Sequence, residues 1–250
     1  MYTFDSLTAD LAAAGFRHDD TVIVHSSMKS IGPVEGGAET VLDVFINYFG
    51  KSGLIVFPEL SHNYVNAEHP RFDVRTTPTS VGILPELFRR RPGVIRSLHP
   101  THSLAAFGPD AAAFVAGHEK FDSPCARNSP WGKLYDRHGK ILFLGASICC
   151  NTFLHGVEEW LPVPGMLTEL HQPLEVVDAE GRVIPVPSRR HVGGHSRFYM
   201  KLEKEYRDSG AMRDARFGDA ACVIGDCRKI GDITLAALKV NPFLFTAEGH

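Results

Sequence analysis

The sequence predicts an α/β protein, built as a three-layer α/β/α sandwich with a mixed central sheet and a β-hairpin insertion. Three observations predict it. Short apolar runs rich in β-branched residues are typical of buried strands, and they alternate with segments whose apolar residues recur at helical spacing. A later stretch alternates in the manner of a hairpin. The 250 residues show no repeat or linker, so we expect a single domain spanning residues 1–250.

The composition is that of a soluble globular protein, with 44% hydrophobic and 22% charged residues. The net charge of −3 offers no basic surface for nucleic acid, and no apolar run is long enough to span a bilayer. The first residues lack the basic-then-apolar pattern of a signal peptide. The five cysteines show no CxxC spacing, which argues against a structural zinc site or a disulfide framework. We therefore expect a cytoplasmic protein without a metal ion, and without nucleic acid or membrane among its partners.

The first half of the chain predicts strands separated by helices. Thr3–Phe16 has the spacing of an amphipathic helix, with Asp5 or Ser6 as its cap. Apolar runs at Thr21–Val24 and Gly53–Phe57 predict buried strands. The other elements expected here are a helix from about Glu35 to Phe49, a helix capped by Thr79 and Ser80, two short strands flanking the turn His99–His102, a short helix over Pro109–Gly117, and a helix that Pro130 begins after the cap Ser129.

Two loops in this half carry residues suited to ligands. His25–Pro33 is rich in serine and precedes a helix, an arrangement that holds phosphates through backbone N–H groups, although an ordinary βα turn explains it too. Ser61–Thr79 is a long polar loop of the kind that is often functional. Its acidic residues suit a cationic ligand, but a solvated loop needs no ligand. His99 and His102 could bind metal, yet no third ligand lies near them, which favours capping or substrate contact.

The stretch Gly145–Trp160 carries the clearest chemical signal. An apolar strand, Lys140–Leu144, leads into it, and Asn151 is placed to cap the helix that follows. On that helix His155 lies three residues before Glu158, so the two side chains share a face. A histidine oriented by a carboxylate at the carboxyl end of a buried strand can act as a general base. The alternative is a surface ion pair without a function.

The last part of the chain begins with a pattern of alternating apolar and polar residues. Leu174–Val177 and Val183–Val186 alternate around Ala179–Arg182 and predict a hairpin. His195–Arg207 has helical spacing. A strand over Ala220–Gly225 and a helix over Ile230–Val240 complete the expected elements.

Four blocks of sequence, taken together and in this order, resemble the aminoglycoside N3-acetyltransferase family, which is distinct from the GNAT fold. These blocks are VHSSMKSIG, TPTSVGILPELFRRRPGVIRSLHPTHSLAAFG, SPWGKL and LFLGASICCNTFLHGVEE. The resemblance runs from about Val22 to Trp160 and continues weakly to the carboxyl terminus. It implies an enzyme that uses acetyl-CoA as co-substrate and acetylates an amine, with a role in antibiotic resistance where that amine belongs to an aminoglycoside. It leaves the oligomeric state open, with a homodimer as one option.

The resemblance also implies roles for particular residues. The family's catalytic histidine falls on His155 and its acidic companion on Glu158, while Thr152 and backbone amides are candidates for stabilising the oxyanion. The residues expected to contact acetyl-CoA are His25, Ser26, Ser27, Ser30, Thr79, Ser80, Val81, Arg96 and Ser103. The residues expected to contact the acceptor are Glu59, Asp73 and His102. The acceptor is either an aminoglycoside or another small-molecule amine, because these acids do not form a strongly acidic set.

Two other functions remain open from the residues alone. A cysteine-dependent amidohydrolase would use Cys149 or Cys150 as nucleophile with His155 as base. A non-catalytic module would bind CoA without turnover. A hydrolase using His99, His102 and His155 as metal ligands is less well supported.

Overall fold

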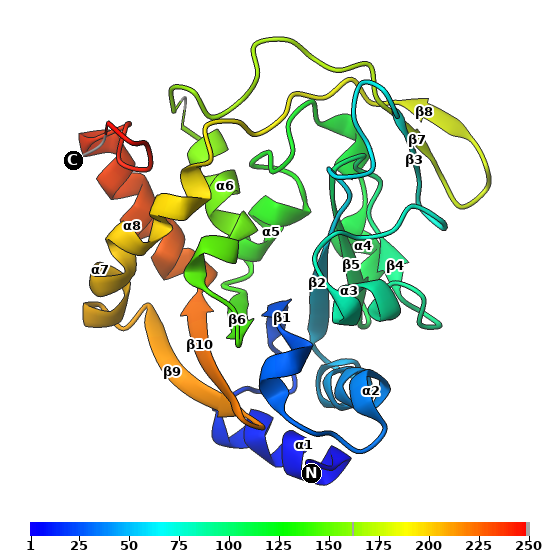
Figure 1. Ribbon diagram of the computed structural model, residues 1–250, viewed down its shortest axis with the longest axis vertical. Coiled ribbons are helices and arrows are strands. Elements are labelled where there is room, and N and C mark those ends of the chain that lie inside the picture. Colours follow the sequence, from blue (N-terminus) through cyan, green and yellow to red (C-terminus); the bar gives the residue numbers. More distant parts are fainter. Residues whose placement is uncertain (162, 249–250) are drawn as a thin grey trace.

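A computed structural model describes residues 1–161 and 163–248, and its centre is a seven-stranded sheet (Figure 1). The strands in their order across the sheet are β4 (Ile95–Arg96), β5 (His102–Phe107), β2 (Leu54–Leu60), β1 (Thr21–Ser26), β6 (Lys140–Leu144), β10 (Ala220–Asp226) and β9 (Met212–Phe217). β1 runs parallel to its neighbours β2 and β6, and every other neighbouring pair in this sheet is antiparallel. The predicted mixed central sheet is confirmed.

Helices cover both faces of this sheet because its central strands are apolar on both sides. In β1, Val22 and Val24 belong to one hydrophobic cluster and Ile23 to the other, as the two-residue period of a strand requires. The first cluster contains residues of α1 (Phe4–Ala13), α2 (Gly37–Phe49) and α3 (Ile83–Phe88). The second contains residues of α4 (Ala111–Val115), α5 (Pro130–Asp136), α6 (Thr152–Glu159), α7 (Glu203–Asp208) and α8 (Cys227–Val240). The predicted α/β/α layers are therefore confirmed.

A second, three-stranded sheet lies at the edge of the molecule, far from α7 and α8 (Figure 1). It consists of β3 (Arg71–Asp73), β7 (Glu175–Val177) and β8 (Val183–Pro185). β7 and β8 form the predicted hairpin, and β7 also pairs in parallel with β3. Phe72, Val176 and Val186 belong to a small separate core. β3 lies inside the predicted polar loop, where three residues are too few to show the alternation of a strand.

Several local predictions need correction. Thr3, rather than Asp5 or Ser6, caps α1: its hydroxyl accepts from the N–H of Ser6, and the Ser6 hydroxyl accepts from the N–H of Thr3. Asn151 stands at the N-cap position of α6 but makes no side-chain capping bond. The sequence did not predict β9. Only the two end residues of this strand are buried, so its sequence shows no alternation of apolar and polar residues.

The helix expected after Thr79 begins later than predicted. α3 starts at Ile83, after Gly82, and no side chain caps it. The hydroxyls of Thr79 and Ser80 instead donate to the carbonyl of Leu60, at 3.2 Å and 3.0 Å. These bonds hold the segment against the carboxyl end of β2. Short 3-10 segments connect the other elements: η1 (Met28–Ile31), η2 (His118–Lys120), η3 (Ile148–Cys150) and η4 (His195–Leu202), the last running directly into α7.

Candidate active site

A cavity of about 590 Å³ lies at the carboxyl ends of the three parallel strands. The helix that follows β1 packs on one face of the sheet, whereas α6, which follows β6, packs on the other. The chain thus leaves neighbouring strands in opposite directions at this point, which is where open α/β sheets bind ligands. The cavity is lined by Val24, His25, Ser26, Pro58, Leu60, His62, Ser80, Val81, Pro85, Thr101, His102, Ala146, Cys149, Cys150, Thr152, His155, Arg190, His191 and Ser196.

His155 stands in this cavity wall, and a buried hydrogen-bond network holds its ring. The Nδ1 atom of His155 lies 2.6 Å from the hydroxyl of Tyr199 and 3.4 Å from Oε2 of Glu158. The Tyr199 hydroxyl donates to the same Oε2 at 2.6 Å. Nδ1 of His195 lies 2.6 Å from Oε1 of Glu158. Both oxygens of this fully buried carboxylate are therefore bonded.

The network determines which nitrogen of His155 can accept a proton. Because Tyr199 donates its proton to Glu158, its oxygen accepts the Nδ1–H of His155, and Nε2 is left as the unprotonated nitrogen. Burial would raise the pKa of the Glu158 carboxyl, but hydrogen bonds from His155, His195 and Tyr199 lower it below the ordinary value. The ionised carboxylate of Glu158 can thus stabilise a positive charge on the His155 ring.

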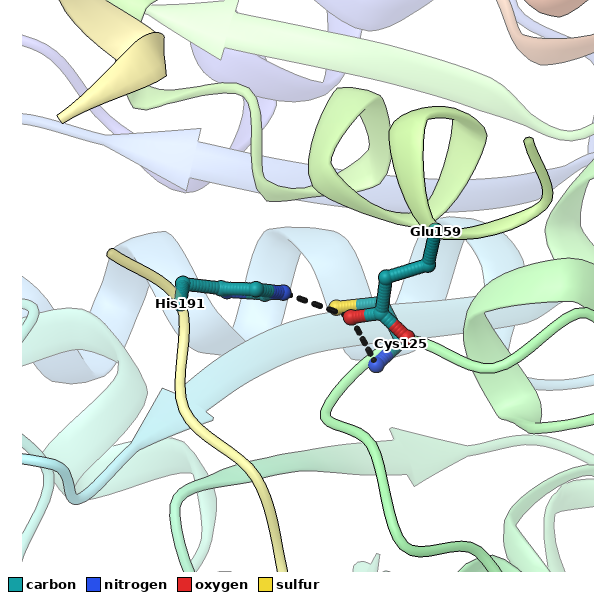
Figure 2. A group of neighbouring side chains, drawn as sticks. All are labelled: Cys125, Glu159 and His191. Atoms are coloured by element: carbon teal, nitrogen blue, oxygen red, sulfur yellow. Dashed lines mark hydrogen bonds and ion pairs between the residues drawn. The ribbon is translucent and has the colours of Figure 1, made fainter. Parts of the chain in front are cut away.

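Glu159, the next residue, anchors a second buried network. Oε1 of Glu159 accepts from Nε2 of His191 at 2.5 Å and from the backbone N–H of Cys125 at 2.8 Å, and Oε2 accepts from the Ser123 hydroxyl at 2.6 Å. Figure 2 shows the imidazole of His191 and the backbone nitrogen of Cys125 converging on this carboxyl group. The ring of His191 also stacks on that of His155, with 4.5 Å between centroids. The Glu159 network therefore fixes the wall beside the candidate base.

The same cluster offers the ligand types of a metal centre. Atoms of Cys125, Glu159 and His191 that could coordinate an ion lie within 4.8 Å of one another. A cysteine binds metal as the thiolate, however, and burial raises the pKa of the Cys125 thiol well above its usual value. The oxygens of Glu159 already accept three hydrogen bonds. These features favour a hydrogen-bonded cluster over a metal centre.

Burial keeps several histidines of the cavity uncharged at neutral pH. It lowers the pKa of His25 to about 4 and lowers the pKa of His62. It also lowers the pKa values of His102 and His191 well below the ordinary value, and the two rings contact each other edge to face. This part of the wall can thus donate or accept hydrogen bonds without adding positive charge.

The structure divides the residues predicted to contact the donor into two groups. His25, Ser26, Ser80 and Val81 line the cavity, as does Thr152 at the start of α6. The side chains of the others form hydrogen bonds within the protein: Ser30 donates to Ser27 at 2.9 Å, Thr79 donates to Leu60, and Arg96 donates to Ser103 at 3.0 Å.

Arg96 illustrates why the second group does not reach the cavity. Its guanidinium is buried and donates to Ser103, to the carbonyl of Thr77 at 2.5 Å and to the carbonyl of Glu59 at 3.2 Å. Ser103 donates to the same Glu59 carbonyl at 2.8 Å. The pairing of β4 with β5 and of β5 with β2 creates this arrangement. Arg96 and Ser103 are therefore bonded to each other and to β2, and they are not among the residues that line the cavity.

Of the residues predicted to contact the acceptor, His102 lines the cavity and the two acids do not. Glu59 is a fully buried residue of β2, and its two strand neighbours line the cavity, so its own side chain points to the opposite face of the sheet. Burial raises the pKa of Glu59 well above the ordinary value. Asp73 lies in β3 and forms an ion pair with Arg75 at 3.1 Å. The sequence had placed both acids in or beside a solvated loop.

The sequence was compared with models of known protein families. The sequence model of a family described as "Aminoglycoside 3-N-acetyltransferase" matches residues 23–239, which include the cavity and both networks. This chain belongs to that family.

Named relatives within the family share about a third of their aligned residues with it. The chain is 35% identical over 192 residues to aminoglycoside N(3)-acetyltransferase VII of Streptomyces paromomycinus, covering 70% of this chain and 66% of that protein. It is 31% identical over 199 residues to aminoglycoside N(3)-acetyltransferase III of Serratia marcescens, covering 73% of each. The match thus spans just under two thirds of the Streptomyces paromomycinus protein.

Solved structures extend the likeness over nearly the whole fold. A structure described as AAC-IIIb in a binary complex with CoASH has a TM-score of 0.83 and 25% identity, covering 96% of this chain and 97% of that one. The YokD protein from Bacillus subtilis has a TM-score of 0.84 and 27% identity, covering 96% of this chain and 94% of that one. The predicted family and fold class are confirmed.

Within this family site, the sequence did not point to three residues that complete the networks. His191, His195 and Tyr199 lie four residues apart, a spacing that places side chains on one helical face. The sequence predicted a helix over His195–Arg207 but indicated no role for the polar aromatic residues in it. The recurrence of polar aromatic residues at intervals of four was the available signal, although His191 precedes η4 and reaches Glu159 from an extended segment.

Glu159 predicts a distinctive pH dependence of stability. Burial raises the pKa of its carboxyl to about 7. A group whose pKa is raised on folding stabilises the protein fully below its unfolded pKa and loses that contribution as the pH rises through its folded pKa. We therefore expect the free energy of unfolding to fall by on the order of 3 kcal/mol between about pH 4.5 and pH 7.5 from this residue.

Urea unfolding at a series of pH values measures this effect. Glu159→Gln keeps the shape and removes the titration, so the slope across pH 5–7 should flatten in that variant. Glu169→Gln, a change at an exposed carboxyl, serves as the control and should leave the slope unchanged. An identical slope in wild type and Glu159→Gln would contradict the assignment.

Within the described residues, no helix combines the length and apolar character needed to cross a membrane.

Proposed function

We propose that this protein transfers the acetyl group of acetyl-CoA to a primary amine of a small molecule, with His155 as general base. The observation that carries the proposal is the His155–Tyr199–Glu158–His195 network at the wall of the cavity. The relatives are named as aminoglycoside N(3)-acetyltransferases, and CoASH occupies a structural neighbour. Aminoglycosides are accordingly the first acceptors to test.

The donor would enter along the carboxyl ends of β1 and β2. His25 and Ser26 are the last two residues of β1, and Ser80 and Val81 line the same cavity. Nε2 of His25 and Oγ of Ser26 are buried and have no hydrogen-bond partner within the described part of the chain. Buried polar atoms of this kind are usually satisfied, so these two suit the amide and carbonyl groups of a pantetheine arm.

The chemistry needs a base because an amine is largely protonated at neutral pH. The ammonium form of the amine first loses one proton to solvent. Nε2 of His155 then accepts a second proton from the amine nitrogen as that nitrogen attacks the thioester carbonyl. The positive charge that arises on His155 faces ionised Glu158 through the Nδ1–H and the Tyr199 hydroxyl.

The oxyanion of the tetrahedral intermediate would lie near the start of α6. Thr152 is the first residue of that helix and lines the cavity. The first N–H groups of a helix have no partner inside the helix, so they and the Thr152 hydroxyl can donate to the oxyanion. When the C–S bond breaks, the CoA sulfur takes a proton from His155, and the base is regenerated.

The cysteine alternative has one supporting observation, since Cys149 and Cys150 both line the cavity. Against it, within the described residues the Cys149 thiol has only a long contact, 4.0 Å, to the carbonyl of Arg197, and no hydrogen bond joins it to His155. A catalytic thiol needs a base within hydrogen-bond reach. Serine variants of both cysteines that keep acetyl transfer would exclude this alternative.

Calorimetry with acetyl-CoA, followed by a thiol-release assay across a panel of amines, tests the proposal. We expect acetyl-CoA to bind and at least one amine to release CoASH in a stoichiometric reaction. Binding without turnover on any amine would favour the non-catalytic module. Absence of acetyl-CoA binding by the folded protein would make the proposed function wrong.

A further inference from the structure

The cavity wall beside His155 carries a positive charge without a negative one. Among the described residues that line it, none is aspartate or glutamate, and Arg190 is the single arginine or lysine. His25, His62, His102 and His191 are kept uncharged by burial. Arg190 therefore offers an anion a charged partner on this wall, whereas no carboxylate among these lining residues offers one to a cation.

The acids near the site are not free to change this balance. Glu158 and Glu159 are enclosed in their own hydrogen-bond networks. Glu59 points to the other face of the sheet, and Asp73 is paired with Arg75. A ligand with several ammonium groups would therefore lose its hydration in this cavity without gaining a carboxylate partner.

Backbone hydrogen bonds hold Arg190 in place, whereas its side chain forms few hydrogen bonds with the other described residues. Its N–H donates to the Thr168 hydroxyl at 3.0 Å, and its carbonyl accepts from the N–H of Thr168 at 2.9 Å. The next residue, His191, is fixed by Glu159. The one side-chain hydrogen bond of Arg190 in the described part of the chain is long, 3.4 Å from Nη2 to the carbonyl of His62. Most of the guanidinium fork is thus available to a ligand.

We propose that the acceptor is a small primary amine that also carries a carboxylate or a phosphate, and that Arg190 binds this anionic group while the amine reaches His155. The inference rests on the proposed acetyl transfer and names its acceptor class. An arginine binds either anion through two parallel hydrogen bonds. These two hydrogen bonds would fix the anionic group of the acceptor against the cavity wall. The length of the linker between the anionic group and the amine then determines which acceptors react.

Matched pairs of amines that differ only in the anionic group test the inference. Phosphoethanolamine is compared with ethanolamine, γ-aminobutyrate with n-butylamine, and gentamicin serves as the polycation. With wild-type protein, we expect the anionic member of at least one pair to have the higher kcat/KM, and gentamicin to react more slowly than that anionic amine.

Three variants locate the effect. Arg190→Gln is expected to lower kcat/KM for the anionic amine by roughly 10-fold or more, the loss expected for a charged hydrogen bond, and to leave the KM for acetyl-CoA unchanged. Arg189→Gln removes the same charge one residue away, outside the cavity and 3.8 Å from Asp122, and should leave both constants unchanged. Arg190→Glu should shift the preference toward the uncharged or cationic amine, a gain that misfolding cannot produce.

The opposing outcomes are distinct. Faster acetylation of gentamicin than of every anionic amine would overturn the inference and leave the proposed function standing. A raised KM for acetyl-CoA in Arg190→Gln, with the anionic amine unaffected, would assign Arg190 to the donor and overturn it as well. Failure of acetyl-CoA to bind at all would instead overturn the proposed function.

Discussion

Replacing His155 with alanine is expected to lower the rate of acetyl transfer by on the order of 100- to 10,000-fold, the usual contribution of a positioned general base. The ring lines the cavity, and Tyr199 occupies its Nδ1 atom, so Nε2 is the nitrogen that can take the proton of the amine. Acetyl-CoA should still bind, because the groups proposed to hold it lie on β1 and on the segment before α3. Calorimetry and thiol release, measured on the same preparation, separate the two effects.

His155→Asn provides the sharper comparison. The amide nitrogen of asparagine can replace Nδ1–H as the donor to Tyr199, while the variant lacks any basic nitrogen in the place of Nε2. We therefore expect His155→Asn to be nearly as inactive as His155→Ala but to unfold at a urea concentration closer to that of wild type. His69→Ala, at an exposed histidine, should leave both activity and stability unchanged. Wild-type turnover by His155→Asn would show that His155 is not the base.

The central sheet and this histidine could be predicted because their signals are local. β1, β2 and β6 are runs of mostly apolar residues that are buried on both faces of the sheet. Such a run can be recognised from four or five consecutive residues. His155 and Glu158 lie on one helix, so their meeting follows from a spacing of three. The structure adds Tyr199 between them, through a hydroxyl that bonds both side chains.

The rest of the site depends on contacts between distant parts of the chain, which spacing cannot show. His195 meets Glu158 across 37 positions, and His191 meets Glu159 across 32. The strand predicted over Gly53–Phe57 ended before Glu59, and a charge is costly to bury in a strand. β2 nevertheless continues through it to Leu60, and burial raises the pKa of the Glu59 carboxyl well above its ordinary value. Predicting acceptor contacts from acidic residues therefore failed where the fold had buried or paired those acids.

Glu158→Gln is the second change with a large expected effect. In wild type, His195 and Tyr199 each donate to one oxygen of Glu158. Glutamine offers one oxygen and one NH₂ group, so one of the two donors would face another donor inside the protein. The variant also lacks the negative charge that stabilises protonated His155. We expect kcat to fall by on the order of 100-fold or more, and the free energy of unfolding to fall by about 1–3 kcal/mol at pH 7.

The pH dependence distinguishes this role from simple loss of structure. The pKa of Glu158 is lower in the folded protein than its ordinary value, so its ionised form contributes stability above the unfolded pKa and loses that contribution as the pH falls through the folded pKa. Wild type should therefore lose stability below about pH 4 through this residue, and Glu158→Gln should not show that loss. Glu159 acts with the opposite sign and at higher pH, so the two carboxyls separate in a single pH series.

Tyr199→Phe completes the test, because it removes the hydroxyl that joins His155 to Glu158 and keeps the buried ring. If Tyr199 positions the base, the pH profile of kcat/KM should shift in this variant, since the hydroxyl that joins His155 to Glu158 is removed. We expect the fall in kcat to be roughly 10-fold, smaller than in Glu158→Gln, because the carboxylate charge remains. An unshifted pH profile in both variants, together with wild-type turnover, would mean that the network supports the fold and takes no part in proton transfer.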